Sequence, residues 1–207
     1  MTQKLISQGA EAEIYLNSKN NIVKQRIPKS YRIPEIDNKI RIRRTRAEIK
    51  ILNKLSKIIN VPKVFSENKT KANTLIHMEF INGKKLSEEL NNLDLKKQIE
   101  TIKKIAISVE KMHKEGIAHS DLTTSNMILK RDELYLIDFG LSFQNAKYED
   151  KAVDIHLFKQ ALEAKHFENW KKLYSVFEET YLKQGKAESE KVIERLKKVE
   201  QRGRYKH

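Results

Sequence analysis

The sequence predicts an α+β fold in which a strand-rich first part and a helical second part form two small lobes around one cleft. Its 207 residues are enough for one domain, or for two small lobes with a real core. Short apolar runs bounded by turns fill the first third, whereas apolar residues at three- and four-residue spacing dominate the rest. The Asn82-Gly83 turn separates the two patterns, so we expect a first lobe over residues 1–82 and a second over 83–207.

The first part is expected to hold several strands and one helix. Apolar alternation predicts strands in LISQGAEAEIYL, NNIVKQRI, VPKVFSEN and NTLIHMEFI, and Pro28 and Pro34 predict a loop after the second of these strings. From Asp37 to Ile59 the spacing favours a helix. The apolar residues that would share its buried face are Ile40, Ala47, Ile51, Leu55 and Ile58.

The second part is expected to be mostly helical. A first helix would begin after an N-cap at Asp94 and end before Gly116, and the short strands MILK and LYLID follow it. Three further helices are expected over residues 154–164, 168–183 and 186–200. The second of them carries a stripe that we interpret as core, formed by Trp170, Leu173, Tyr174, Phe177 and Tyr181.

The charge of the chain is strongly positive. Lys and Arg number 42 against 28 Asp and Glu, a net charge of +14. This excess favours an anionic partner such as nucleic acid, nucleotide or an acidic protein, although a lysine-rich surface also accompanies adaptation to heat or salt. Basic residues concentrate between Lys24 and Lys50 and again near the C-terminus, at Arg202, Arg204 and Lys206.

Several classes of protein are excluded by composition. The absence of cysteine excludes disulfides, zinc-thiolate sites and a cysteine nucleophile. No apolar run is long enough to span a bilayer, and the N-terminal residues lack the features of a signal peptide. We therefore expect a cytoplasmic protein without a membrane partner.

The motif HSDLTTSN over residues 119–126, with Asp138-Phe139-Gly140 twelve residues after its Asn, carries the chemistry. Phosphoryl transfer needs one carboxylate to orient or deprotonate the acceptor, and an amide oxygen and a second carboxylate to hold Mg²⁺ against a triphosphate. In this layout the chain resembles the protein-kinase superfamily. The resemblance implies that Asp121 is catalytic, that Asn126 and Asp138 are metal ligands, and that His119 serves packing and hydrogen bonding.

The same resemblance implies an ATP site in the first lobe. Lys24 matches the strand lysine that pairs with the α- and β-phosphates, and Glu48 would pair with Lys24 and orient it. The loop QGAEAE keeps one glycine of the usual phosphate-loop motif, and Met78 would lie behind the adenine, whose edge would face the Glu79 carbonyl and the Ile81 N–H. The ATP-binding residues implied are Gly9, Ala10, Glu11, Ala12, Glu13, Lys24, Glu79 and Ile81.

Three departures from the usual kinase pattern point to a particular subgroup of kinases. Ser120 replaces the arginine that reads a phosphorylated activation loop, Thr123 replaces a lysine, and only residues 141–207 follow Gly140. These features predict a minimal two-lobed kinase-like fold with a truncated substrate platform. We also expect that its activity does not require activation-loop phosphorylation and that a bound partner controls it.

These departures, with the strings VKQRIPKSYRIPEID, RRTRAE, HSDLTTSNM and RGRYK, resemble the PRPK family of the KEOPS (EKC) tRNA-modification complex. The resemblance extends from Gly9 to Lys206. It implies an atypical Ser/Thr kinase and ATPase subunit that uses ATP and Mg²⁺. Its partners would be the threonylcarbamoyl transferase subunit (fused to it in some archaea), other KEOPS subunits, and tRNA modified to threonylcarbamoyladenosine beside the anticodon. Arg202, Arg204 and Lys206 are the candidates for contact with tRNA or a partner.

Two other functions remain open on the sequence. A free-standing RIO-like protein kinase or small-molecule phosphotransferase would share the catalytic motif, although the latter usually adds a larger helical substrate domain. A non-catalytic nucleotide-binding scaffold is disfavoured by the joint presence of Lys24, Asp121, Asn126 and Asp138, because each has a role only when Mg-ATP chemistry occurs. The phosphoryl acceptor, a protein or water, is also open.

Overall fold

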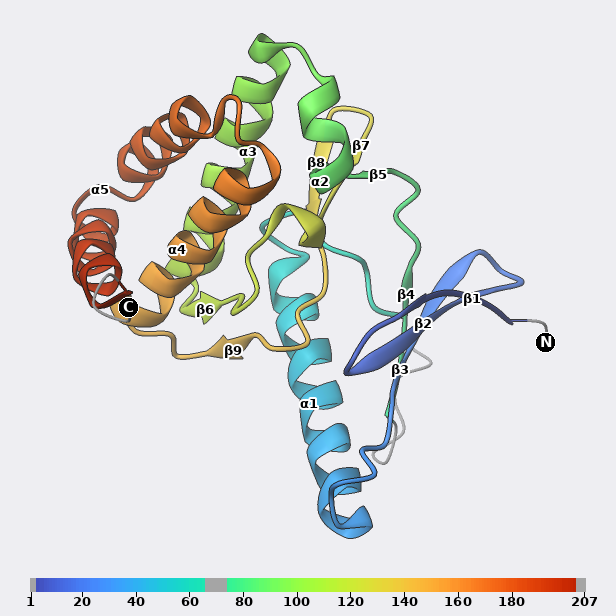
Figure 1. Ribbon diagram of the computed structural model, residues 1–207. Helices are drawn as coiled ribbons and strands as arrows, with labels where there is room; N and C mark the ends of the chain where they lie inside the picture. Colours follow the sequence, from blue (N-terminus) through green and yellow to red (C-terminus); the bar gives the residue numbers. More distant parts are fainter. Residues whose placement is uncertain (1–2, 66–73, 204–207) are drawn as a thin grey trace.

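The computed structural model describes residues 3–65 and 74–203 and confirms the predicted α+β architecture (Figure 1). An antiparallel sheet and one long helix are built from the first part of the chain, and a cluster of helices is built from the second part. The chain passes from one to the other after β4, so residues from both parts meet at the site described below.

Among the described residues, four antiparallel strands form the N-terminal sheet in the order β1-β2-β3-β4. Their bounds are β1 Gln3–Gln8, β2 Ala12–Asn17, β3 Asn21–Arg26 and β4 Leu75–Glu79. Lys24 lies at the centre of this sheet, opposite Ile14 on β2 and Ile76 on β4. Because side chains alternate along a strand, Lys24 and Arg26 lie on the same face.

The long helix α1 (Pro34–Leu55) begins and packs differently from the prediction. Pro34 was expected in a loop, but it opens the helix, because the first turn needs no backbone N–H and the fixed φ of proline suits it. Ile51 and Leu55 are buried as predicted, whereas Ala47 is exposed. The helix instead buries several polar residues, among them Glu48. The carboxylate of Glu48 forms ion pairs with Lys24 and Arg26 on β3.

The segment between α1 and β4 is less regular than expected. Within the described residues, the strand predicted for VPKVFSEN is reduced to a β-bridge between Val64 and Met78. Its last residues, 66–68, lie outside the described residues, as does Asn73 at the start of NTLIHMEFI. The remainder of that string forms β4 and supplies the edge of the site.

The chain crosses to the helical part at Gly83, and glycine is required there. A Cβ at Gly83 would lie 2.6 Å from the carbonyl oxygen of Leu129 and 2.6 Å from the side chain of Ile128. Contacts this short with backbone cannot be relieved by a side-chain rotation, so the crossing packs directly against the strand that follows the catalytic motif.

The second part contains helices and short strands. The helices are α2 Leu86–Glu89, η2 Leu90–Asn92, α3 Leu95–Lys114, η3 Thr124–Asn126, α4 Tyr148–Lys165 and α5 Trp170–Gly203. The strands are β5 Lys84–Lys85, β6 Ile117–Ala118, β7 Met127–Lys130, β8 Glu133–Leu136 and β9 Phe143–Gln144. The strands pair as β5-β7-β8 and as β6-β9. No helix in the described ranges is long and apolar enough to cross a membrane.

The helix α3 follows its prediction closely. The Asp94 side chain accepts a hydrogen bond from the backbone N–H of Lys97 at 2.9 Å, which is an N-cap. Gly116 takes a left-handed φ of 70° just past the end of the helix. The apolar face of α3 packs into the main core, whose largest members include Phe158, Phe177 and Tyr181 from α4 and α5.

The last two helices have different bounds from those predicted. The helix expected from Asp154 begins at Tyr148, because the Asp150 side chain caps the backbone N–H of Lys147 at 2.8 Å. Asp154 therefore lies inside α4, where it is fully buried. The two helices expected over 168–183 and 186–200 form α5, which is interrupted at Lys186, where φ is 51°.

Candidate active site

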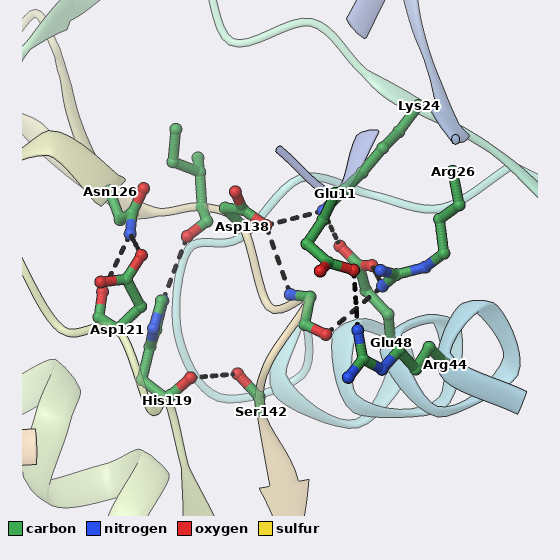
Figure 2. Close-up of polar contacts among 12 residues, drawn as sticks. Glu11, Lys24, Arg26, Arg44, Glu48, His119, Asp121, Asn126, Asp138 and Ser142 are labelled. Atoms are coloured by element: carbon green, nitrogen blue, oxygen red, sulfur yellow. Dashed lines mark hydrogen bonds and ion pairs between the residues drawn. The ribbon is translucent and has the colours of Figure 1, made fainter. Parts of the chain in front are cut away.

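The motif HSDLTTSN lies between β6 and β7 and includes the short helix η3. The amide of Asn126 donates two hydrogen bonds to Asp121, one to the carboxylate at 2.8 Å and one to the backbone carbonyl at 2.9 Å (Figure 2). The amide nitrogen of Asn126 thus orients Asp121, and its oxygen is the atom available to a metal ion.

A buried carboxylate from α4 holds this loop in place. Asp154 accepts hydrogen bonds from the backbone N–H groups of His119 at 2.6 Å and Ser120 at 2.7 Å. Its Oδ2 also lies 3.2 Å from Nε2 of His113, whose Nδ1 lies 2.9 Å from the Tyr181 hydroxyl. Ser120 itself has a left-handed φ of 66°. Asp154, expected from the sequence only as the first residue of a helix, thus anchors the loop that carries Asp121.

His119 packs against the second half of the motif. Its Nε2 donates to the carbonyl of Ile137 at 3.1 Å, and its ring lies 4.8 Å from the ring of Phe139. The hydroxyl of Ser142 donates to the His119 carbonyl at 2.9 Å. These contacts join the loop of Asp121 to the segment of Asp138, and none of them brings His119 to a reacting position.

Asp138 faces the cleft from a left-handed backbone conformation with φ of 60°. Its side chain is 53% exposed, and its Oδ1 accepts from Lys24 Nζ at 2.6 Å and from the Gly140 N–H at 3.3 Å. Partial burial acts to raise the pKa of Asp138, but the ammonium of Lys24 outweighs it and lowers the pKa below the usual value. Asp138 is therefore ionised at neutral pH, as a metal ligand must be.

Lys24 joins the sheet, the long helix and Asp138. Its ammonium lies 2.6 Å from Glu48 Oε1 on α1, so the pair that the sequence predicts is present, and also 2.6 Å from Asp138. Burial acts to lower the pKa of Lys24, but the two carboxylates outweigh it and raise the pKa above its ordinary value. The lysine is thus a fixed, charged donor in the cleft.

The other oxygen of Glu48 is held by a residue that sequence reasoning overlooked. Arg26 Nη2 lies 2.6 Å from Glu48 Oε2, and both side chains are 2% exposed (Figure 2). A signal for this pair was available, because Arg26 follows Lys24 at the two-residue spacing that places both on one face of a strand.

The predicted phosphate loop forms the turn between β1 and β2. The Gly9 N–H donates to the Ala12 carbonyl at 2.9 Å, and the Ile27 N–H donates to the Glu11 carbonyl at 3.2 Å. The Glu11 carboxylate turns toward α1 and pairs with Arg44 at 2.7 Å (Figure 2). The carboxylate of Glu13 bonds the hydroxyl of Tyr15 at 2.6 Å and the amide of Gln8 at 3.2 Å.

Two adjoining cavities extend along the cleft. One, of about 240 Å³, lies at the polar end below the phosphate loop. Its lining includes Gly9, Ala10, Glu11, Ala12, Lys24, Arg26, Asp121, Asp138 and Gly140. The other, of about 450 Å³, adds an apolar end. It is lined by Lys24, Asn126 and Asp138 together with Ile14, Ile22, Met78, Glu79, Phe80, Ile81, Ile128 and Ile137. One end of the cleft is apolar and the other carries both cations and carboxylates, a combination that suits a nucleotide bound together with a divalent cation.

The donor set at the polar end fits a divalent cation that is shared with phosphate. Asn126 and Asp138 line the same cavity, and both offer the oxygen ligands that Mg²⁺ prefers. Within residues 3–65 and 74–203 no cluster of three or more His, Asp or Glu side chains could hold a metal alone. Two protein ligands together with phosphate oxygens are the usual way in which such sites bind Mg²⁺.

Comparisons with known proteins agree with this geometry. The family model for the protein kinase domain matches residues 1–162. The KEOPS complex subunit Bud32 of Pyrococcus abyssi is 40% identical, covering 98% of this chain and 96% of that protein. A probable serine/threonine-protein kinase BUD32 homolog of Archaeoglobus fulgidus is 38% identical, covering 95% of this chain and 94% of its own length.

A longer relative shares the same region. A probable bifunctional tRNA threonylcarbamoyladenosine biosynthesis protein of Methanobrevibacter smithii is 37% identical over 100% of this chain, which corresponds to 38% of that protein. The kinase-type arrangement of Lys24, Glu48, Asp121, Asn126 and Asp138 and the full-length similarity lead to one assignment. The chain belongs to the protein kinase domain family and, within it, to the family of the KEOPS complex subunit Bud32, so it is a kinase-type phosphotransferase.

Proposed function

We propose that the chain binds Mg-ATP in this cleft and that Asp121 orients the hydroxyl or water that attacks the terminal phosphate. The observation that carries the proposal is the convergence of Asp121, Asn126, Asp138 and Lys24 on adjoining cavities. In phosphoryl transfer there is little covalent chemistry for a protein to perform, so positioning and charge stabilisation supply most of the rate.

The two ends of the cleft have separate tasks in this proposal. At the apolar end, Met78 closes the back of the adenine pocket, and the backbone of Glu79 and Ile81 meets the adenine edge. At the polar end, Lys24 contacts phosphate, and the backbone of the loop from Gly9 to Glu13 covers it, because the carboxylates of Glu11 and Glu13 are engaged within the protein. Residues 1–82 and 83–207 would act as two lobes that hold the nucleotide between them.

Asn126 and Asp138 would hold Mg²⁺ against the phosphates. When bound, the metal ion neutralises charge on the triphosphate. Lys24 would add a second positive charge near the phosphates, and Asn126 holds the Asp121 carboxylate through its 2.8 Å hydrogen bond. The carboxylate of Asp121 then accepts a hydrogen bond from the acceptor and aligns it.

We also infer the biological setting from the relatives. Their names describe a KEOPS complex subunit and a bifunctional tRNA threonylcarbamoyladenosine biosynthesis protein, and in the latter the matched region is 38% of the chain. We propose that this chain is the kinase and ATPase subunit of such a complex in the cytoplasm. It would bind the threonylcarbamoyl transferase subunit, other KEOPS subunits and tRNA, and would support threonylcarbamoyladenosine formation.

ATP turnover by the chain alone, with the transferase subunit, and with both the transferase subunit and tRNA tests this proposal. We expect turnover that is lost when Mg²⁺ is chelated and restored when Mg²⁺ is returned, and that changes severalfold when both partners are added. Absence of turnover in every combination would contradict the ATP chemistry. Turnover that does not change when the transferase subunit and tRNA are added would contradict the proposal that the chain works within the KEOPS complex.

The basic C-terminus is our candidate for contact with tRNA. Arg202 lies in the last turn of α5, where its side chain is 63% exposed and pairs with Glu149 at 2.6 Å. Arg204 and Lys206 lie outside the described residues. An exposed ion pair contributes little to stability, so Arg202 can leave Glu149 for a phosphate at small cost.

Deletion of residues 201–207 should weaken tRNA binding by the assembled complex. Each of the three cations near phosphate releases about one counterion, so the slope of log affinity against log salt should become shallower by about 2–3. We would measure tRNA affinity at several salt concentrations, with transferase binding as the control, which should be unchanged. An unchanged salt slope would remove the tail from the tRNA site.

A further inference from the structure

Arg26 is a buried cation beside the active site to which no role has yet been given. It is the last residue of β3, is 2% exposed, and lies on the same face of the sheet as Lys24. Burying a guanidinium is costly unless carboxylate and carbonyl oxygens surround it. Its partners therefore indicate what it does.

The first partner of Arg26 is Glu48. Arg26 holds Oε2 of Glu48 at 2.6 Å while Lys24 holds Oε1 at 2.6 Å, so the two oxygens of one buried carboxylate each meet a different cation. A carboxylate held at one oxygen can rotate about its last bond, whereas one held at both oxygens is fixed in plane. Arg26 thus orients Glu48 independently of Lys24.

The second partner lies on the segment that follows Asp138. Arg26 Nη2 is 3.4 Å from the carbonyl oxygen of Gly140. A Cβ at Gly140 would meet Asp138 Oδ1 at 3.1 Å, Lys24 Nζ at 3.2 Å and Arg26 Nη2 at 3.4 Å, so the segment passes directly over the ionic cluster. One guanidinium therefore touches both the α1 helix and the backbone next to the metal-binding carboxylate.

Glu48 has an electrostatic need for a second cation in addition to Lys24. Arg26, Glu48, Lys24 and Asp138 form a continuous ion-paired chain with two positive and two negative groups. When Lys24 turns its charge toward phosphate, Glu48 would be left as a buried carboxylate with a weakened partner. Arg26 would keep its 2.6 Å ion pair with Glu48 and so continue to compensate the charge of the buried carboxylate.

We propose that Arg26 is a positioning residue that locks Glu48 and the Gly140 segment in the aligned arrangement without a phosphorylated activation loop. Ser120 stands at the motif position where the kinase pattern has an arginine, so a lock internal to β3, α1 and Gly140 is the alternative that this chain provides. The inference rests on the proposed roles of Lys24 and Asp138.

The test compares ATP turnover by Arg26→Met, Arg26→Lys, Glu48→Gln and the double variant Arg26→Met/Glu48→Gln. Methionine keeps the buried aliphatic volume but removes the charge. We expect Arg26→Met to lower kcat by about 10–100-fold and to change KM for ATP by less than about threefold, since Arg26 aligns groups rather than binding substrate. Arg26→Lys should recover part of kcat, because lysine can meet Glu48 through a single donor. Arg43→Met, at an exposed position on α1, is the matched control and should retain wild-type turnover.

The double variant separates positioning from a general structural effect. If Arg26 acts through Glu48, the double variant should lose about as much kcat as the worse single variant. Losses that multiply would show two independent effects and overturn the inference. Thermal unfolding of each variant reports folding separately. If Arg26→Met does not fold, the same comparison is made with Arg26→Lys and Arg26→Lys/Glu48→Gln.

Failure of this inference is distinguishable from failure of the proposed function. Wild-type turnover by folded Arg26→Met, alongside an inactive Asp121→Ala variant, would overturn the role of Arg26 alone. Full turnover by Asp121→Ala would instead overturn the proposed chemistry, whatever Arg26 does.

Discussion

Replacing Asp154 by Ala is expected to lower the free energy of unfolding by about 3–5 kcal/mol and to abolish ATP turnover. The substitution leaves the N–H groups of His119 and Ser120, and Nε2 of His113, without their buried acceptor. A buried donor without a partner costs about 1–3 kcal/mol. Because the structure around the missing carboxylate relaxes, we expect the total cost for the three donors to be smaller than three separate losses added together. The loop that carries Asp121 would then no longer be held.

Urea unfolding and ATP turnover of Asp154→Ala and Asp154→Asn check this expectation. Asparagine keeps the size and one acceptor oxygen but places an NH₂ group against a donor, so its loss should be intermediate. Glu163→Ala, at an exposed position on the same helix, is the control and should change stability by no more than about 0.5 kcal/mol. Wild-type stability and turnover in Asp154→Ala would show that the loop is anchored elsewhere.

The parts of the site that the sequence could predict are those with a motif or a fixed spacing. Asp121, Asn126 and Asp138 belong to one pattern, and the structure brings them to adjoining cavities. The Lys24–Glu48 pair was predicted from the family pattern and is present. Their roles in binding and catalysis stay predictions that the variants test.

The parts that could not be predicted depend on partners that are distant in the sequence. Asp154 was predicted only as the first residue of a helix, but it is buried inside α4, where it accepts hydrogen bonds from the backbone of His119 and Ser120. Arg26 is a charged residue of a type that is usually exposed, yet it is buried because it pairs with Glu48 on α1. Ala47 was assigned to the core by its spacing, but it is exposed. The helix α1 instead buries polar residues such as Glu48 beside the site.

A second large effect on catalysis is expected at Asp121. Its carboxylate is partly buried, lines the cavity at the polar end of the cleft, and is oriented by Asn126 at 2.8 Å. Losing a positioned general base lowers turnover by about 10²–10⁴-fold. ATP binding should be largely kept, because Lys24, Asn126 and Asp138 remain. Asp121→Asn keeps the shape but removes the charge and should be nearly as inactive.

Whether Asp121 positions the attacking group is tested by ATP turnover of wild type and Asp121→Ala, with Mg-ATP affinity measured on the same preparations. Asp132→Ala, at an exposed turn between β7 and β8, is the control for a lost carboxylate and should match wild type. We expect Asp121→Ala to turn over ATP about 10²–10⁴-fold more slowly than wild type at nearly unchanged affinity. Equal turnover in wild type and Asp121→Ala would contradict this expectation.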